Sequence, residues 1–333
     1  MSDAPRVLIV KMSSMGDVIH GLPVVNDIVR ARPGATVDWV VEEGFSVLPR
    51  LHPGVRNVLP VALRRWRRSL LTPTTWRELR AARHKMRATG YDRVIDIQGL
   101  LKSAWVARWA HAPTSGFDRD SARESVAARC YDRRFAVART LHAIERNRRL
   151  AAVALEYDFE GPPRFTLAVP QLGLGELKNL ASRGPYAVLL TNASRPTKLW
   201  PAPAWQEVEA DLARRGLRSL LVWGTAEEGA ATRLRAQQMV QAHVAPRASL
   251  DQLAALLAGA RVVVGIDTGL THLAAAVGAP TVGIFCDYDP QLVGISGDAP
   301  CASLGGVAGG PSATEVIDAI DRVLAPTSAS NER

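Results

Sequence analysis

The chain of 333 residues contains few of the residues that build disulfide frameworks or zinc sites. Its three cysteines, Cys130, Cys286 and Cys301, lie far apart and form no Cys-x-x-Cys pair. Their spacing argues against both kinds of site and fits a reducing cytoplasm. Aromatic residues make up only 6% of the chain. The sequence has no zinc pattern and no aromatic run of the RNA-recognition type, so we expect no nucleic-acid partner.

Long apolar runs are also missing. No stretch approaches the roughly 18 residues that indicate a membrane span. Residues 1–5 have neither the basic flank nor the apolar core of a signal peptide. With 47% hydrophobic and 22% charged residues, the composition is that of a globular protein. The length exceeds that of a usual single core, so we expect two domains in a cytoplasmic protein.

Acidic residues are outnumbered by basic ones. The formal net charge is +9 and the isoelectric point about 10.0, which implies an anionic partner. The densest basic run is Arg64-Arg65-Trp66-Arg67-Arg68. Guanidinium groups bind phosphates and carboxylates through paired N–H donors. The run alone fits an anionic substrate, an anionic membrane surface or nucleic acid, or else a solvated surface.

Strand and helix patterns alternate along the chain, which favours an α/β class with parallel sheets. In the first half we expect strands at 6–10, 36–42, 55–61 and 93–97, helices at 18–31 and 74–88, and a mostly helical segment at 120–155. Glycines and prolines interrupt the pattern at 156–184. In the second half we expect strands at 186–190, 217–223, 261–266 and 280–285, and helices at 201–215, 249–258 and 313–324. The predicted domains are 1–165 and 175–312, two Rossmann-like halves facing across a cleft, with a helix at 313–325 able to cross back to the first. The polar tail 325–333 is expected to be disordered.

Residues 262–276 carry the most specific local pattern. They read as a buried strand, a polar turn at Asp267-Thr268-Gly269 and the start of a helix, with His272 one turn inside it. The first turn of a helix leaves backbone N–H groups unpaired and carries partial positive charge, so it can bind phosphate. An ordinary capped strand-to-helix turn would give the same pattern.

Several segments together resemble the lipopolysaccharide heptosyltransferases of glycosyltransferase family 9, and within them those of type I. The likeness extends over about residues 6–325 and is most specific in the SSMGD motif at 13–17 and the DTGLTH motif at 267–272, in that order, with RRWR at 64–67 between them. Further similar segments lie at 38–45, 96–103 and 142–146.

The resemblance implies a GT-B fold and an inverting transfer of L-glycero-D-manno-heptose. The implied donor is ADP-heptose, and the implied acceptor is the first Kdo sugar of Kdo2-lipid A, in lipopolysaccharide inner-core synthesis. It implies no cofactor and no bound metal. We expect a monomer in peripheral contact with the cytoplasmic face of the inner membrane.

The resemblance also assigns residues. Asp17 takes the place of the general base, although a helix cap would place an aspartate there as well. Donor binding is carried over to Ser194, Lys198, Glu227, Asp267, Thr268, Gly269 and His272. Acceptor binding is carried over to Ser14, Gly16, Arg64, Arg67, Arg68, Gln98, Arg123 and Arg146. The position of Glu227 requires a one-residue gap, which leaves Glu228 as the alternative.

Two segments depart from the family pattern. After Phe285 the family commonly has Gly-Pro-Thr-Asp-Pro, whereas this chain has Cys286-Asp287-Tyr288-Asp289-Pro290. Residues 191–193 also differ from the usual His-Ala-Thr type of sequence. The first departure makes the preference for the donor nucleotide less certain.

Other classes remain as alternatives. Heptosyltransferase II or another sugar-nucleotide transferase would share both motifs. A dinucleotide dehydrogenase would need a Gly-x-Gly-x-x-Gly turn after its first strand, but residues 11–17 contain one glycine. A basic protein that binds nucleic acid or a membrane, or a lectin-like protein without turnover, would also accommodate the charge.

Overall fold

The computed structural model describes residues 4–325 and divides the chain into two compact units between Ala168 and Val169. This division lies inside the interval 166–174 that the sequence left between its two predicted domains. The tail beyond residue 325 and the first three residues lie outside the described part of the chain. Among the described residues, no helix combines the length and apolarity needed to cross a membrane.

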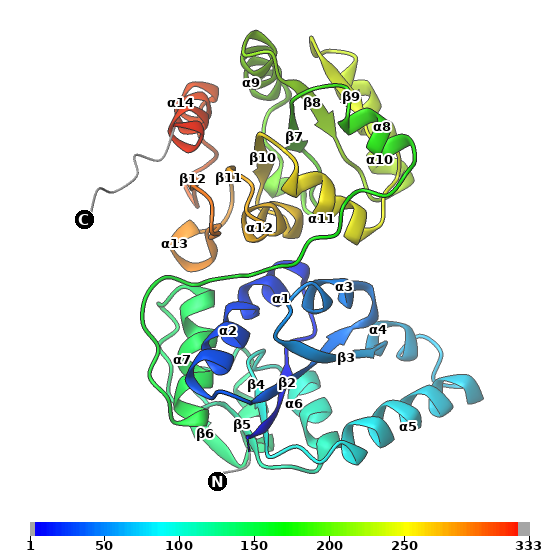
Figure 1. Ribbon diagram of the computed structural model, residues 1–333, viewed down its shortest axis with the longest axis vertical. Coiled ribbons are helices and arrows are strands. Elements are labelled where there is room, and N and C mark those ends of the chain that lie inside the picture. Colours follow the sequence, from blue (N-terminus) through cyan, green and yellow to red (C-terminus); the bar gives the residue numbers. More distant parts are fainter. Residues whose placement is uncertain (1–3, 326–333) are drawn as a thin grey trace. The chain divides into compact units, whose positions relative to one another are not determined.

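The first domain contains a six-stranded sheet in the order β3-β2-β1-β4-β5-β6, with every pair parallel (Figure 1). Its strands are β1 (Arg6–Val10), β2 (Thr36–Glu42), β3 (Val55–Val61), β4 (Arg93–Asp96), β5 (Thr114–Phe117) and β6 (Arg133–Phe135). Its helices are α1 (Met15–Gly21), α2 (Pro23–Ala31), α3 (Val47–Arg50), α4 (Leu63–Trp66), α5 (Pro73–Ala88), α6 (Leu101–Ala107) and α7 (Ala143–Leu155).

The second domain repeats this topology, in the order β12-β11-β10-β7-β8-β9, again with parallel pairs. Its strands are β7 (Tyr186–Leu190), β8 (Arg218–Leu221), β9 (Ala242–Val244), β10 (Val262–Ile266), β11 (Thr281–Phe285) and β12 (Cys301–Gly305). Its helices are α8 (Glu176–Ala181), α9 (Ala202–Arg214), α10 (Ala226–Ala236), α11 (Leu250–Ala258), α12 (Gly269–Ala276), α13 (Pro290–Val293) and α14 (Ala313–Leu324).

Each sheet forms the centre of its own hydrophobic core. The central strands are near-continuous runs of Val, Leu and Ile because helices cover both faces of a parallel sheet. In the first domain Trp39 of β2 is fully buried, and in the second Trp205 of α9 is fully buried. Helix starts follow the capping chemistry in the sequence: Ser312 and Glu315 form a capping box at α14.

The structure corrects two expectations about elements. The first helix begins at Met15 rather than near residue 18, because the backbone N–H of Ser14 is capped by Asp17. In segment 120–155 the α-helix begins only at Ala143. Before it the chain forms a short 3₁₀ helix at Ser125–Cys130 and the edge strand β6. Helix α14 packs its apolar face into the core of the second domain.

Candidate active site

In both domains the candidate residues follow the carboxyl ends of neighbouring parallel strands. The strand order places a topological switch point between β1 and β4 in the first sheet and between β7 and β10 in the second. Ligands of open α/β sheets bind at such points. Asp17 follows β1 and Gln98 follows β4, whereas Lys198 follows β7 and Asp267 follows β10. The sequence motifs therefore lie where the fold places a ligand.

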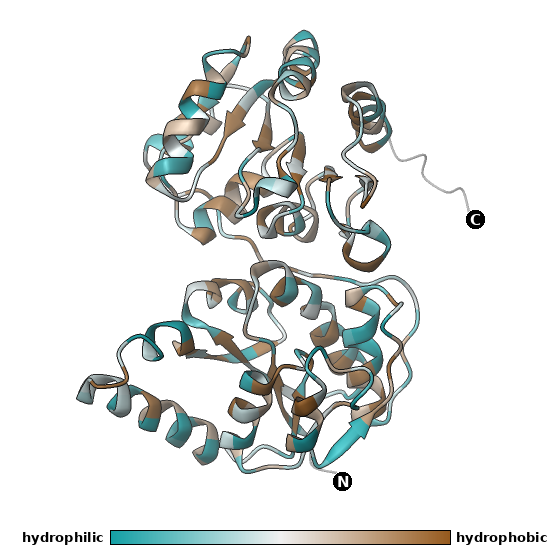
Figure 2. Cartoon of the chain, turned by 180° about the vertical axis from the view of Figure 1, so that it is seen from behind, coloured by the Kyte–Doolittle hydropathy of each residue, from teal (hydrophilic) through white to brown (hydrophobic). Residues whose placement is uncertain are grey.

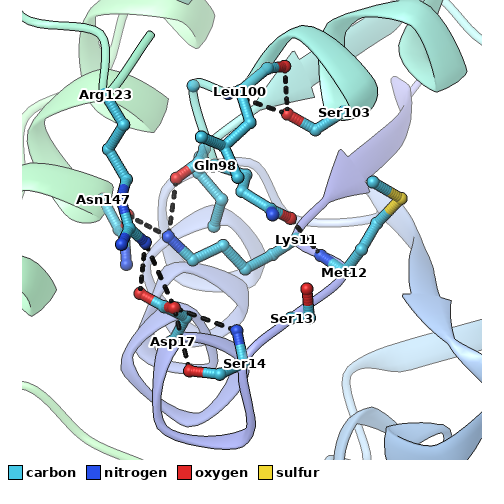
Figure 3. A network of polar contacts seen from close by, with 12 residues as sticks. Lys11, Met12, Ser13, Ser14, Asp17, Gln98, Leu100, Ser103, Arg123 and Asn147 are labelled. Atoms are coloured by element: carbon cyan, nitrogen blue, oxygen red, sulfur yellow. Dashed lines mark hydrogen bonds and ion pairs between the residues drawn. The ribbon is translucent and has the colours of Figure 1, made fainter. Parts of the chain in front are cut away.

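Asp17 is the centre of a charged network in the first domain (Figure 3). Its Oδ2 accepts hydrogen bonds from the backbone N–H of Ser14 at 2.9 Å and from the Ser14 hydroxyl at 3.0 Å. One guanidinium nitrogen of Arg123 lies 3.3 Å from both carboxylate oxygens. Asp17 thus does cap α1, but its side chain keeps 24% exposure, so a substrate can reach it. Gly16 lies in the same first turn.

Lys11 is a second member of this network, which sequence reasoning did not assign to the site. Its side chain is buried at the end of β1 and donates to the backbone carbonyl of Ile97 at 2.8 Å and to Asn147 Oδ1 at 3.5 Å. Burial lowers the pKa of Lys11 below its usual range, because desolvation disfavours the charged amine; the negative charge of Asp17 acts in the opposite direction.

The pKa of Asp17 lies below its ordinary value. Burial alone would raise it, but the positive charges of Lys11 and Arg123, together with the hydrogen bonds from Ser14, outweigh burial. Asp17 is therefore an ionised carboxylate at neutral pH, which is the state that a proton acceptor requires.

Gln98 and Arg146, two of the predicted acceptor residues, line the same end of the sheet. Gln98 is buried, and its Oε1 accepts from the backbone N–H of Met12 at 2.6 Å. Its Nε2 is buried without a hydrogen-bond partner among the described residues. Arg146 donates to the carbonyl of Ser121 at 2.6 Å and lies over the ring of Phe117. The free Nε2 of Gln98 offers a donor to a ligand.

The arginine run forms α4 and the turn after it. Arg65 pairs with Glu43 at 3.1 Å and Glu78 at 2.9 Å, so it has a structural partner on each side. Arg64 lies over Phe45, whereas Arg67 and Arg68 have no ion-pair partner among the described residues. No described contact joins these arginines to Asp17. They follow β3, so they lie at the same edge of the sheet as the Asp17 loop.

In the second domain Lys198, Asp267 and His272 form one cluster. Lys198 Nζ donates to the backbone carbonyl of Asp267 at 3.0 Å and to its carboxylate. His272 Nε2 lies 3.4 Å from the other carboxylate oxygen. Burial would raise the pKa of Asp267, but the hydrogen bonds from His272 and Lys198 and their charges keep it below its ordinary value. The structure therefore brings three predicted donor residues together.

The helix that follows Asp267 begins as the sequence predicts. Thr268 is the residue before α12, and its side chain does not cap the helix. Its hydroxyl lies 3.3 Å from that of Thr271. The N–H of Thr271 donates to the carbonyl of Thr268 at 3.1 Å, which leaves the N–H groups of Gly269 and Leu270 available to an anion.

The structure separates Glu227 from Glu228. Glu228 accepts hydrogen bonds from the backbone N–H groups of Gly224 and Thr225 at 2.8 and 3.1 Å and so closes a capping box on α10. Glu227 is exposed in the same turn. Hydrogen bonds from its own backbone and from Thr225 hold the pKa of the Glu227 carboxyl below its ordinary value. Both carboxylates thus have partners within the turn, and Glu227 is the more exposed of the two. Ser194 is exposed on the loop that carries Lys198.

The departure from the family pattern at Asp287 has a structural consequence. Asp287 accepts a hydrogen bond from Thr197 at 2.6 Å and pairs with Arg195 at 3.4 Å. It thereby fixes the loop that carries Lys198. Neither Lys11 nor Asp287 could be assigned from local sequence, because their partners are distant along the chain. The available signal for Lys11 was a lysine directly after an apolar strand.

No group of three or more His, Cys, Asp or Glu side chains among residues 4–325 is arranged to hold a metal ion. The candidate contacts to an anionic ligand are instead lysine, arginine, hydroxyl and backbone N–H groups.

Comparison with known proteins matches a model of glycosyltransferase family 9 (heptosyltransferase) to residues 79–305. Lipopolysaccharide heptosyltransferase 1 of Pseudomonas aeruginosa is 44% identical over 306 residues, which cover 89% of this chain and 85% of that protein. Lipopolysaccharide heptosyltransferase 2 of Salmonella typhimurium is 25% identical over 309 residues, 86% of this chain and 84% of that protein.

Two solved structures of E. coli heptosyltransferase WaaC, one with ADP and one with ADP-2-deoxy-2-fluoro heptose, are similar to this chain over its length. Their TM-scores are 0.85 and 0.82 and their identities 38% and 37%, and each match covers 95% of this chain and 99% of the other. The expected α/β class of two Rossmann-like domains, the GT-B class, is confirmed. Shared topology, shared sequence and a family match over more than half of its length place the chain in glycosyltransferase family 9, the heptosyltransferases.

Proposed function

We propose that this enzyme transfers L-glycero-D-manno-heptose from ADP-heptose to the first Kdo of Kdo2-lipid A, with inversion at the anomeric carbon. The observation that carries the proposal is the carboxylate of Asp17, held ionised and partly open at the switch point of the first sheet. The name of the Pseudomonas aeruginosa relative supports the reaction class, and the greater identity to a type 1 than to a type 2 enzyme favours this acceptor.

The chemistry requires a base and a stabilised leaving group. Asp17 takes the proton from the attacking hydroxyl of the acceptor as that oxygen forms the new bond to the anomeric carbon. The bond from that carbon to the β-phosphate oxygen breaks on the opposite face, and ADP leaves with the electron pair. A positioned general base contributes about 10²–10⁴-fold, and fixed positive groups stabilise the charge that develops on the diphosphate.

In each domain a basic side chain of the candidate site forms an ion pair with an aspartate: Arg123 with Asp17 in the first, and Lys198 with Asp267 in the second. We infer that Lys198 exchanges Asp267 for the donor diphosphate. The backbone N–H groups of Thr268, just before α12, and of Gly269, its first residue, add hydrogen bonds. His272, which contacts the carboxylate of Asp267, also faces the donor. Ser194 contacts the donor as well, and Glu227 binds its ribose.

Arg123 performs the corresponding exchange on the acceptor side. When it leaves Asp17 for an anionic group of the acceptor, the carboxylate loses a positive neighbour and becomes more basic. Arg64, Arg67, Arg68 and Arg146 hold the remaining carboxylates and phosphates, and Ser14, Gly16 and Gln98 shape the site around the sugar. A lipid-linked acceptor also implies peripheral contact with the cytoplasmic face of the inner membrane.

The reaction as proposed needs neither metal nor cofactor. The test is product formation from ADP-heptose and Kdo2-lipid A in EDTA, followed by NMR of the new linkage. We expect one heptose per acceptor, in the anomeric configuration opposite to that of the donor, at the rate seen with added Mg²⁺. Loss of turnover in EDTA would contradict the metal-free reaction. Transfer only to an acceptor that already carries a heptose would indicate a type II enzyme instead.

A further inference from the structure

The turn between α4 and α5 lies at the outer edge of the first domain (Figure 1) and carries large apolar side chains that are exposed. Leu70, Leu71 and Trp76 are 51%, 99% and 47% exposed. Burial of apolar side chains is favourable, so three of them in water represent stabilisation that the isolated domain does not use. The hydropathy colouring shows apolar residues at the turn between α4 and α5, whereas α5 itself is largely hydrophilic (Figure 2).

Hydrogen bonds hold these three side chains, which we call the apolar tip, in a defined turn. The indole N–H of Trp76 donates to the carbonyl of Leu70 at 2.8 Å. The hydroxyl of Thr75 forms hydrogen bonds of 2.9 Å with the hydroxyls of Ser69 and Thr72 across the turn. The exposure is therefore built into the turn, because the backbone that presents Leu70 and Leu71 is fixed from both sides.

Unpaired positive charge surrounds the apolar tip. Segment 63–90 contains eight arginines and one lysine but a single acidic residue, Glu78. Glu78 is already occupied, by the indole N–H of Trp66 at 2.7 Å and by Arg65 at 2.9 Å. The exposed guanidinium groups next to the tip have no ion-pair partner among the described residues; they are Arg67, Arg68, Arg77 and Arg80.

We propose that the apolar tip inserts into the interfacial region of an anionic lipid bilayer and anchors the enzyme there. Leucine side chains reach the acyl boundary, and a tryptophan suits the level of the headgroups. Arginines near an anionic surface are attracted by its negative potential. Apolar contact and positive charge together fit a bilayer with negative headgroups. The inference rests on the proposed function in one respect: a lipid-linked acceptor gives the anchor its purpose.

The test is sedimentation of the full-length enzyme with vesicles of phosphatidylcholine containing phosphatidylglycerol, against vesicles of phosphatidylcholine alone. The variant is the double substitution Leu70→Ser and Leu71→Ser. The matched control is Leu174→Ser, which removes a leucine that is 95% exposed in the second domain. We expect wild type and control to bind the anionic vesicles equally, at least tenfold more tightly than the double variant, and all three to bind the neutral vesicles weakly.

Turnover on a deacylated, water-soluble form of the acceptor separates this proposal from the proposed function. We expect the double variant to keep wild-type turnover there and to lose turnover only with acceptor embedded in vesicles. Unchanged vesicle binding in the double variant, or equal binding of the wild type to neutral and anionic vesicles, would overturn the anchor. A wild type that binds anionic vesicles yet transfers heptose to neither acceptor would refute the proposed function and leave the anchor standing.

Discussion

At the scale of single residues, the ionisation of Asp17 depends on a buried neighbour. Lys11 places a positive charge inside the first domain, next to the carboxylate, where water screens it little. The lowered pKa keeps Asp17 ionised as the pH falls below neutral. Because the pKa of Asp17 is lower in the folded than in the unfolded state, its ionisation stabilises the folded state at pH values above the unfolded pKa. This stabilisation is lost as the pH falls through the pKa of the folded state.

Lys11→Met should therefore raise the pKa of Asp17, because it removes that charge and keeps the length of the side chain. We expect the acidic limb of the profile of kcat/KM against pH to move to higher pH, with kcat largely kept on the alkaline side. The matched control is Lys102→Met, which removes a lysine bound to the hydroxyl of Ser13 at 3.3 Å and should leave the limb in place. An acidic limb that stays still in Lys11→Met, or moves to lower pH, would contradict the role of Lys11.

From the sequence, site residues that lie in motifs can be predicted more readily than the residues that contact them in the folded chain. Asp17, Lys198 and Asp267 could be predicted as site residues because their motifs occupy a short stretch of chain. Lys11 could not be assigned, since its contact with Asn147 joins residues 136 positions apart. Asp287 could be recognised as a departure from the family, but its bond to Thr197 depends on how β11 and the loop after β7 come together.

At the scale of elements, the loop that carries Lys198 is held by contacts with the loop that follows β11. Asp287, after β11, holds both Arg195 and Thr197. In the proposed function Lys198 receives the donor diphosphate, which requires a fixed position relative to Asp267. The contacts of Asp287 would provide that position by fixing the loop.

Asp287→Ala should raise the KM for ADP-heptose and leave the KM for the acceptor unchanged. A lost hydrogen bond of this kind costs about 0.5–1.5 kcal/mol, which corresponds to roughly a twofold to tenfold change. Asp289→Ser serves as the control: Asp289 caps α13 through the N–H of Gln291, and a serine keeps that cap. Steady-state kinetics with each substrate varied in turn measures the split, and an equal rise in both KM values would count against the assignment.

Elements with strong periodicity were predicted well, and short ones at sheet edges were not. The expected strands at 6–10, 36–42 and 55–61 match β1, β2 and β3. The outer strand β6 was missed because it spans only three residues, Arg133–Phe135, and two of them are arginines. A strand at the edge of a sheet buries fewer of its side chains than a central strand does, so it needs fewer apolar residues. Its sequence therefore resembles that of a loop.

At the scale of the whole molecule, one topology occurs twice with different chemistry. Both sheets have the same strand order relative to the chain, and both place their charged groups after the strands at the switch point. The sequence predicted the alternation and the two halves, because periodicity is local. It could not predict the strand order, because the order is fixed by long-range packing of helices on the sheet.

The central claim is that the first domain supplies the base and the second holds the donor. The most direct test compares Asp17→Asn with Lys198→Gln by the Kd for ADP-heptose from calorimetry and by single-turnover rate with acceptor. We predict that Asp17→Asn binds the donor as the wild type does but reacts about 10²–10⁴-fold more slowly, whereas Lys198→Gln loses at least about tenfold in donor affinity. Near-normal turnover in Asp17→Asn, or wild-type donor affinity in Lys198→Gln, would contradict the account.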